Sequence, residues 1–220
     1  MKYNEFKGIV SASRLNKYLA ACNNDKMRAM VLYRWNINLS QEFSGILCLF
    51  EVALRNAINI HYKNTLGDSD WLRTEANRIP PALNQKMVDT INNEIIKLSR
   101  RYTHDRLVAS LSFGTWTSLF TKQHYRGLGY NLLNIFPARI TGTKQKDVYK
   151  ELDRIREFRN RIAHHEPICF NNRGEISTDM ATEILNLIEK YIRFLGHNPA
   201  DIFWGIPSPT NTINKINTYV

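Results

Sequence analysis

Cysteine is scarce in this chain, and the three cysteines that occur form no recognisable metal or disulfide pattern. Cys22, Cys48 and Cys169 are isolated, and none belongs to a C-x-x-C pair. Disulfide-stabilised domains and thiolate zinc sites both need several cysteines at defined spacings. The composition therefore argues against a disulfide framework and against a cysteine metal site, and it favours a reducing cytoplasm.

Strand signals are also missing. The chain has no alternating apolar–polar runs and no Asn-Gly or Asp-Gly hairpin turn, whereas apolar residues recur at three- and four-residue intervals almost throughout. This periodicity predicts an all-α fold. The expected helices cover about residues 11–22, 25–36, 40–66, 81–101, 105–111, 114–124, 143–165 and 177–195.

Long hydrophobic runs are absent as well. The first 22 residues carry polar side chains throughout, and no later stretch reaches the roughly 18 apolar residues of a membrane span. We therefore expect a cytoplasmic protein with no signal peptide and no membrane partner. We expect one all-helical domain over residues 1–205, in which Phe203 and Trp204 dock a last short turn, and a loosely held tail over 206–220 that is rich in Ser, Thr and Asn.

Negative charge is depleted. Lys and Arg outnumber Asp and Glu 30 to 20, which gives a formal charge of +10 and favours nucleic acid or anionic surfaces as partners. Residues 106–146 contain neither Asp nor Glu, so their cations have no local counter-charge. These cations are the predicted RNA-binding residues: Arg106, Lys122, Arg126, Arg139, Lys144 and Lys146.

Aromatic residues are interleaved with these cations, a pattern typical of single-stranded nucleic-acid binding, because phosphates pair with cations and bases stack on rings. A second interpretation is open. Phe113, Trp116 and Phe120 share one helical face, as core residues do.

The stretch EFRNRIAHHEPI, residues 157–168, concentrates groups that transfer protons and bind anions. Histidine exchanges protons near neutral pH, arginine holds a phosphate oxygen in every protonation state, and asparagine can orient either. Together they suit phosphoryl transfer without a metal, in which an RNA 2′-hydroxyl loses a proton and the leaving 5′-oxygen gains one. The predicted catalytic residues are Arg159, Asn160 and His164.

Helix geometry limits this motif. Asn160 and His164, four residues apart, share one face, whereas Arg159 and His164 lie about 140° apart on an ideal helix. Either the helix distorts before Pro167, or a second helix or a second protomer completes the site. A site that is completed by a second protomer implies a homodimer, and we favour this arrangement.

A second element with the same order of residues lies in EVALRNAINIHY, residues 51–62. It contains Arg55, Asn56 and His61, and the Arg55–His61 separation equals that of Arg159 and His165. Two interpretations are open: a partner for the first motif within one chain, or a structural arginine that pairs with Glu51.

RNRIAHHEPI resembles the R-N-x-x-x-H signature of HEPN ribonucleases. Together with LYRWNINLSQEF, FEVALRNAI and LSFGTWTSLF, in this order, it resembles the Abi-like family, which includes the AbiD and AbiF abortive-infection proteins. The resemblance spans about residues 10–195. It implies an all-α fold of the HEPN type, a HEPN-like helical bundle with additional helices. It also implies phage defence and metal-independent RNA cleavage that leaves a 2′,3′-cyclic phosphate, often at a site completed by two copies of the motif.

Carried onto this chain, the resemblance makes Arg159 the phosphate-binding residue, Asn160 the polar second position and His164 the acid/base. It leaves His165 and the Arg55 element outside the minimal signature. The expected activity needs no cofactor and no metal, and the expected partner is RNA. The alternative is a non-catalytic RNA-binding protein that assembles with, or is neutralised by, a small non-coding RNA, as in a toxin–antitoxin pair.

Overall fold

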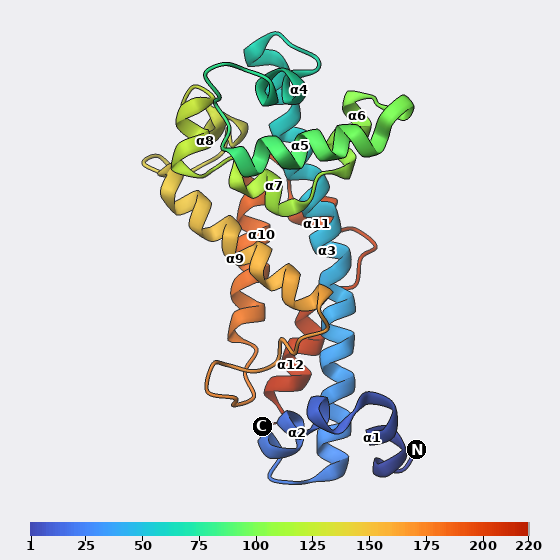
Figure 1. Cartoon of the computed structure of the whole chain (residues 1–220). Helices are drawn as coiled ribbons and strands as arrows, with labels where there is room; N and C mark the ends of the chain where they lie inside the picture. Colours follow the sequence, from blue (N-terminus) through green and yellow to red (C-terminus); the bar gives the residue numbers. More distant parts are fainter. Residues whose placement is uncertain (220) are drawn as a thin grey trace. The chain divides into compact units, whose positions relative to one another are not determined.

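A computed structural model describes residues 1–219 of the chain. The described chain is helical, with one isolated bridge between Phe170 and Ile176 and no β-strand, so the all-α prediction is confirmed. The helices, labelled in Figure 1, are α1 Tyr3–Val10, α2 Ala12–Ala21, α3 Lys26–Leu66, α4 Trp71–Ala76, α5 Gln85–Leu98, η1 Ser99–Arg101, α6 His104–Ser110, α7 Phe113–Ser118, α8 Lys122–Gly127, η2 Leu132–Ile135, α9 Gln145–Ala163, α10 Asp179–Phe194, α11 Pro199–Ile202 and α12 Thr210–Asn217.

The chain folds into two compact units. Unit 1 consists of residues 1–47, 158–187 and 203–220, and unit 2 of residues 48–157 and 188–202. Both units are discontinuous in the sequence, and α3, α9 and α10 contribute residues to both. The expected single domain over residues 1–205 stays a prediction.

Unit 1 is built around the first half of α3. Figure 1 shows α1 and α2 beside its first turns. The rings of Phe43 and Phe158 pack edge to face at 4.8 Å, and those of Tyr18 and Phe170 at 5.0 Å. Such aromatic pairs bury large apolar areas and fix the packing of helices that are distant in the sequence.

The predicted helix break between residues 36 and 40 is wrong, because α3 runs unbroken from Lys26 to Leu66. Ser40 is not an N-cap: its hydroxyl donates to the carbonyl of Asn36 at 2.9 Å, inside the helix. Asn36 is buried, and its side chain accepts a hydrogen bond from the Ile168 N–H at 2.8 Å. The polar residues that suggested a break therefore fasten α3 to a distant loop.

Unit 2 contains α4 to α8 and several large buried aromatic residues. Trp71, Trp116, Phe120 and Phe136 are fully buried, and the rings of Phe120 and Phe136 stack at 5.9 Å. The buried residues of α9 that lie in this unit, Val148, Leu152 and Ile155, recur at the spacing of one helical face.

The helix expected to open at Pro80–Pro81 begins later, at Gln85. The Asn84 side chain accepts a hydrogen bond from the Met87 N–H at 2.9 Å, which is the N-cap arrangement. The helix ends at Leu98 and continues as the short turn η1 to Arg101. Asparagine, rather than the proline pair, therefore sets the start of α5.

The expectation of a loosely held tail is wrong for α12. This helix buries Ile213 and Ile216, and Thr212 Oγ1 donates to Glu42 Oε1 at 2.9 Å. Its apolar residues at three-residue spacing form a face that packs within unit 1. The expected docking of Trp204 is also wrong, because its side chain is 86% exposed.

One described helix, α3, is long and apolar enough to cross a membrane by composition alone. Its most apolar 18-residue window has a mean hydropathy of 1.4, and 33% of that window is buried. The core helix of a soluble protein passes the same test, so this finding is weak evidence for a membrane. Judged by mean hydropathy, the expectation that no stretch resembles a membrane span does not hold for α3. The cytoplasmic location stays a prediction.

Gly127, the last residue of α8, allows a close backbone contact within unit 2. A Cβ atom at this position would lie 2.4 Å from the carbonyl oxygen of Ala82. We expect Gly127→Ala to destabilise the protein by about 3 kcal/mol, because a backbone atom cannot move aside as a side chain can. The melting temperature should fall by roughly 6–12 °C.

The matched control is Gly8→Ala in α1, where nothing lies within 4 Å of the added methyl group. Alanine is a better helix former than glycine, so this control should leave stability unchanged or raise it by up to about 1 kcal/mol. Equal melting temperatures for Gly127→Ala and the parent protein would contradict the contact.

Candidate functional site

The predicted catalytic stretch lies at the C-terminal end of α9, in unit 1. The helix closes with a Schellman motif, in which the Glu166 N–H donates to the Arg161 carbonyl at 2.8 Å and the His165 N–H donates to the Ile162 carbonyl at 3.0 Å. His165 occupies the left-handed position of this motif, with φ of 56°. Glycine is usual there, and histidine is among the few other residues that tolerate it.

The helix is regular up to His164, whose N–H donates to the Asn160 carbonyl at 2.9 Å. The proposed distortion before Pro167 is therefore not found between Arg159 and His164. These two side chains leave the helix about 140° apart, as on an ideal helix. A pocket that uses both needs a further element.

The residues of the RNRIAHH motif differ in their exposure to solvent. Arg159 and Asn160 are half-buried, whereas His164 and His165 are exposed. Two imidazoles at the open end of a helix can exchange protons with solvent and with a bound ligand. This end of α9 also carries the partial negative charge of the helix dipole.

Arg161 ties the loop after α9 back to the helix. Its Nη2 donates to the Pro167 carbonyl at 2.7 Å, and its Nε lies 3.5 Å from Glu166 Oε2. Arg161 Nη1 also contacts the sulfur of Met180 at 3.5 Å. Arg161 therefore stabilises the end of α9 and the loop that follows it.

Arg14 of α2 reaches the same helix end, a contact that the sequence did not predict. Its Nη1 donates to the His165 carbonyl at 3.1 Å. Both residues line a cavity of about 550 Å³ in unit 1, together with Tyr18, Tyr33 and Asn36. Arg159, Asn160 and His164 do not line it. His165 therefore lines the same cavity as Arg14, whereas His164 does not.

The second Arg-Asn element lies on α3 in unit 2. Arg55 is half-buried, and its Nε is buried with no hydrogen-bond partner among the described residues. Asn56 is exposed, and His61 Nε2 lies 2.8 Å from Asn131 Oδ1. His61 thus has a structural partner, and a role for this element in an intrachain site stays a prediction.

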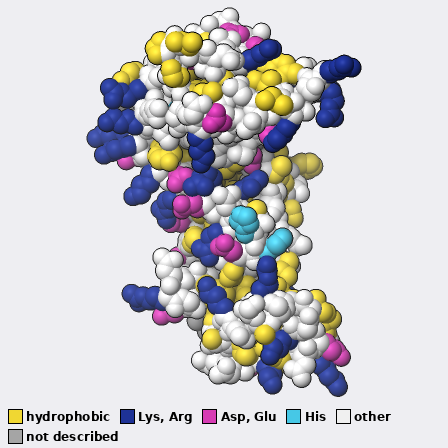
Figure 2. All heavy atoms as spheres, viewed as in Figure 1, with side chains coloured by type: hydrophobic (Ala, Val, Ile, Leu, Met, Phe, Trp, Pro, Cys, Tyr) yellow, Lys and Arg dark blue, Asp and Glu magenta, His cyan; other side chains and the backbone are white. Residues whose placement is uncertain are grey.

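Four of the six predicted RNA-binding residues line one pocket in unit 2. This cationic pocket has a volume of about 650 Å³ and contains Lys122, Arg126, Lys144 and Lys146, together with Tyr125, Tyr130 and Gln145. Within residues 1–219, none of the four cations forms an ion pair with a carboxylate. Figure 2 shows one face of the molecule, on which Lys and Arg outnumber Asp and Glu.

The end of α8 positions the aromatic part of this cationic pocket. Gly129 is in the left-handed region with φ of 96°, and the Tyr130 N–H donates to the Tyr125 carbonyl at 2.8 Å. The Arg126 guanidinium lies 5.9 Å from the Tyr130 ring centre, and its Nε donates to the Tyr130 hydroxyl at 2.6 Å. Tyr130 is 57% exposed, so its ring is open to a stacking partner.

The other two predicted RNA-binding residues lie outside the cationic pocket, and their role in RNA binding stays a prediction. Arg139 is half-buried and donates from Nη1 to the carbonyls of Leu133 and Phe136 at 3.0 and 3.1 Å. Arg106 Nη1 donates to the Arg101 carbonyl at 2.8 Å. Both guanidinium groups thus use part of their N–H donors on backbone carbonyls.

The core interpretation of the FGTWTSLF segment is confirmed. Phe113, Trp116 and Phe120 are all buried, and so is Phe136. These rings cannot stack on nucleic-acid bases without unfolding unit 2. Tyr125 and Tyr130 are the aromatic residues of this segment that line the cationic pocket.

Side chains that ligate metals are not clustered in the described chain. Within residues 1–219, no group of three or more His, Cys, Asp or Glu side chains could hold a metal ion. The metal-free mechanism itself stays a prediction.

No protein-family model matches the chain, and no curated protein or solved structure matches it with significance. The resemblance to Abi-like and HEPN proteins therefore stays a prediction.

His124 is a buried histidine with both ring nitrogens in use. Nδ1 donates to the Ser118 carbonyl at 2.7 Å, and Nε2 accepts a hydrogen bond from the Asn84 N–H at 3.1 Å. This pattern requires the neutral ring, since a protonated Nε2 could not accept. Burial lowers the pKa of His124 accordingly.

We expect the free energy of unfolding to fall as the pH drops below about 6.5, because the unfolded chain then protonates His124 while the folded chain does not. The slope attributable to one such group reaches at most about 1.4 kcal/mol per pH unit. Burial also lowers the pKa of His104, so urea unfolding of the parent should be compared with that of His124→Gln between pH 7.5 and 5. Identical pH slopes in the two proteins would contradict a neutral His124.

Proposed function

We propose that the protein is an RNA-binding protein of phage defence that cleaves RNA without a metal ion at the C-terminal end of α9. The observation that carries the cleavage proposal is the pair of exposed imidazoles at this end, next to the half-buried side chains of Arg159 and Asn160. The role in phage defence rests on the Abi-like resemblance of the four sequence blocks.

The proposed reaction is a transesterification within the RNA. The 2′-oxygen attacks the neighbouring phosphorus, the bond from phosphorus to the 5′-oxygen breaks, and a 2′,3′-cyclic phosphate and a 5′-hydroxyl form. His164 transfers a proton between the reacting oxygens and solvent. Arg159 stabilises the additional negative charge of the phosphorane-like transition state, which lasts only while the bonds exchange.

RNA binding is supported by the cationic pocket of unit 2. Its four cations have no carboxylate partner in the described chain, so phosphates can neutralise them. Tyr130 supplies an exposed ring on which a base can stack.

The same pocket favours a second candidate function, which is binding of a small non-coding RNA without cleavage. Incubation of the full chain with total RNA in EDTA separates the two. Cleavage that persists in EDTA supports the nuclease, whereas stable binding with intact RNA supports the second candidate.

The regular end of α9 leads to a further expectation about subunits. Because Arg159 and His164 diverge by about 140°, we expect a site shared by two protomers. A mixture of Arg159→Ala and His164→Ala proteins should then regain activity, since a mixed dimer assembles one intact pocket. If subunit exchange is demonstrated and the mixture stays as inactive as its components, the shared site is ruled out.

A further inference from the structure

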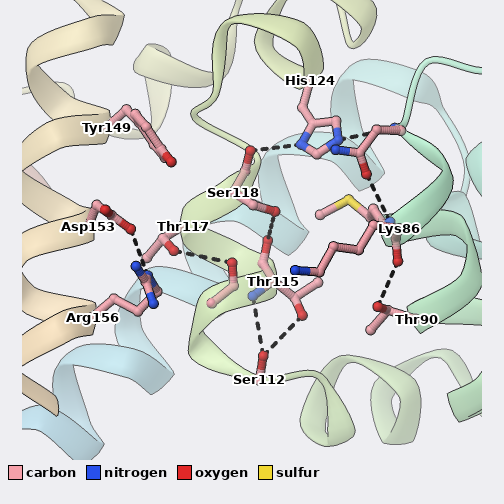
Figure 3. Close-up of a pocket in the computed structure, with 13 residues that line it drawn as sticks. Lys86, Thr90, Ser112, Thr115, Thr117, Ser118, His124, Tyr149, Asp153 and Arg156 are labelled. Carbon is pink, nitrogen blue, oxygen red and sulfur yellow. Dashed lines mark hydrogen bonds and ion pairs between the residues drawn. The ribbon is translucent and has the colours of Figure 1, made fainter. Parts of the chain in front are cut away.

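A polar pocket of about 480 Å³ lies in unit 2, and the proposed function does not use it. Figure 3 shows side chains from four helices and one N-cap around it: Lys86 and Thr90 from α5, Thr115, Thr117 and Ser118 from α7 with its N-cap Ser112, His124 from α8, and Tyr149, Asp153 and Arg156 from α9. The volume lies within the range of pockets that bind small molecules.

Three hydroxyl groups of this pocket donate their protons to backbone carbonyls. Thr90 Oγ1 donates to the Lys86 carbonyl at 2.8 Å, Thr117 Oγ1 to Gly114 at 3.2 Å, and Ser118 Oγ to Thr115 at 2.8 Å. A hydroxyl has one proton and two acceptor lone pairs. In this arrangement the three hydroxyls accept hydrogen bonds from a ligand, and a matching ligand brings several donors.

The pocket also contains one open positive charge. Lys86 is exposed and has no ion pair in the described chain, and Figure 3 shows its side chain extending from α5 toward α7. Arg156 differs, because its Nε donates to Asp153 Oδ1 at 2.6 Å and its Nη2 lies 3.7 Å from Glu157 Oε1. A ligand therefore needs an anionic group for Lys86 in addition to its donors.

His124 is not available as a ligand group, although it lines the pocket. Both of its ring nitrogens already have backbone partners. Asp153 is available, because its Oδ1 accepts from Arg156 and a carboxylate has further lone pairs. A ligand can therefore use the Lys86 ammonium, the shared Asp153 carboxylate and the three hydroxyl acceptors.

We propose that this pocket binds a sugar phosphate, free or as part of a nucleoside monophosphate. The phosphate pairs with Lys86, and the sugar hydroxyls donate to Asp153 and to the hydroxyl oxygens of Thr90, Thr117 and Ser118. Inorganic phosphate would satisfy Lys86 alone, and an uncharged nucleoside only the acceptors. The proposal does not rest on RNA cleavage or on the end of α9.

Calorimetric titration of the full chain with ribose 5-phosphate, AMP, adenosine and inorganic phosphate tests the proposal. We expect the first two to bind, and adenosine and phosphate to bind at least about tenfold more weakly. Lys86→Gln should weaken ribose 5-phosphate binding by roughly 10- to 100-fold, because it removes a charge-assisted hydrogen bond. Ser118→Ala, which removes one acceptor, should weaken it by about 3- to 10-fold.

Two control variants make the outcome specific. Lys97→Gln removes an exposed lysine of the same helix outside the pocket and should leave binding unchanged. Lys122→Gln removes a cation of the cationic pocket and should also leave it unchanged. The proposal is overturned if neither sugar phosphate binds at millimolar concentration, if Lys86→Gln binds normally, if phosphate binds as tightly as the sugar phosphates, or if Lys122→Gln alone abolishes binding.

Discussion

Replacing His164 with alanine should lower the rate of RNA cleavage by roughly 10²- to 10⁴-fold, because the variant loses the group that transfers protons between the reacting oxygens. Folding should be nearly unaffected. His164 is exposed, and its backbone N–H bond to the Asn160 carbonyl does not depend on the side chain. Rates should be measured in EDTA, with thermal unfolding recorded in parallel.

The matched control is His197→Ala, which removes another exposed histidine outside the motif and should cleave RNA at the parental rate. His165→Ala gives the complementary information, since His165 lines the cavity that contains Arg14. A His164→Ala protein that cleaves normally, while His165→Ala is inactive, would move the acid/base role to the Arg14 side of the helix end. A His164→Ala protein that unfolds would show that the residue holds structure.

Replacing all four cations of the cationic pocket, Lys122, Arg126, Lys144 and Lys146, with glutamine should weaken binding of single-stranded RNA by roughly 100-fold near 0.15 M salt. Each lost phosphate contact should also flatten the dependence of log K on log salt by about 0.7, so four contacts should lower the slope by about 2.8. Fluorescence anisotropy with a labelled oligonucleotide at several salt concentrations measures both quantities.

A control of equal charge change is available elsewhere on the chain. Lys7, Lys150, Arg173 and Lys215 are exposed, and their replacement with glutamine removes the same formal charge from outside the cationic pocket. The control should bind more tightly than the pocket variant at every salt concentration. Equal losses in the two variants would mean that net charge alone binds the RNA.

The helical fold could be predicted from the sequence because apolar periodicity reports directly which side of a helix is buried. Prediction failed where a polar residue has a partner far away in the chain. Asn36 looks like part of a helix break, yet it is buried and holds the Ile168 N–H. The tail 206–220 looks polar, yet the two isoleucines of α12 are buried. Neither the contact between Asn36 and Ile168 nor the burial of the two isoleucines can be recognised from the neighbouring residues in the sequence.

The candidate site shows the same limit. The acid-free segment 106–146 lies in unit 2, where it folds so that four of its cations line one pocket: Lys122, Arg126, Lys144 and Lys146. Arg106 and Arg139 carry the same charge, but they bond to backbone carbonyls, and charge alone could not distinguish them. Arg14 contacts His165 across 151 residues of sequence, so no motif spacing could have indicated it.

The most direct test of the central claim is the chemistry of the RNA ends produced in the presence of EDTA. The full chain is incubated with total RNA, and the new ends are analysed beside those from the His164→Ala and His197→Ala proteins. Metal-independent attack by the 2′-hydroxyl predicts new 2′,3′-cyclic phosphate and 5′-hydroxyl ends with the parent and with His197→Ala, and their loss with His164→Ala. Intact RNA, ends with 5′-phosphates, or equal cleavage by all three proteins would contradict the assignment of the α9 end as a ribonuclease site.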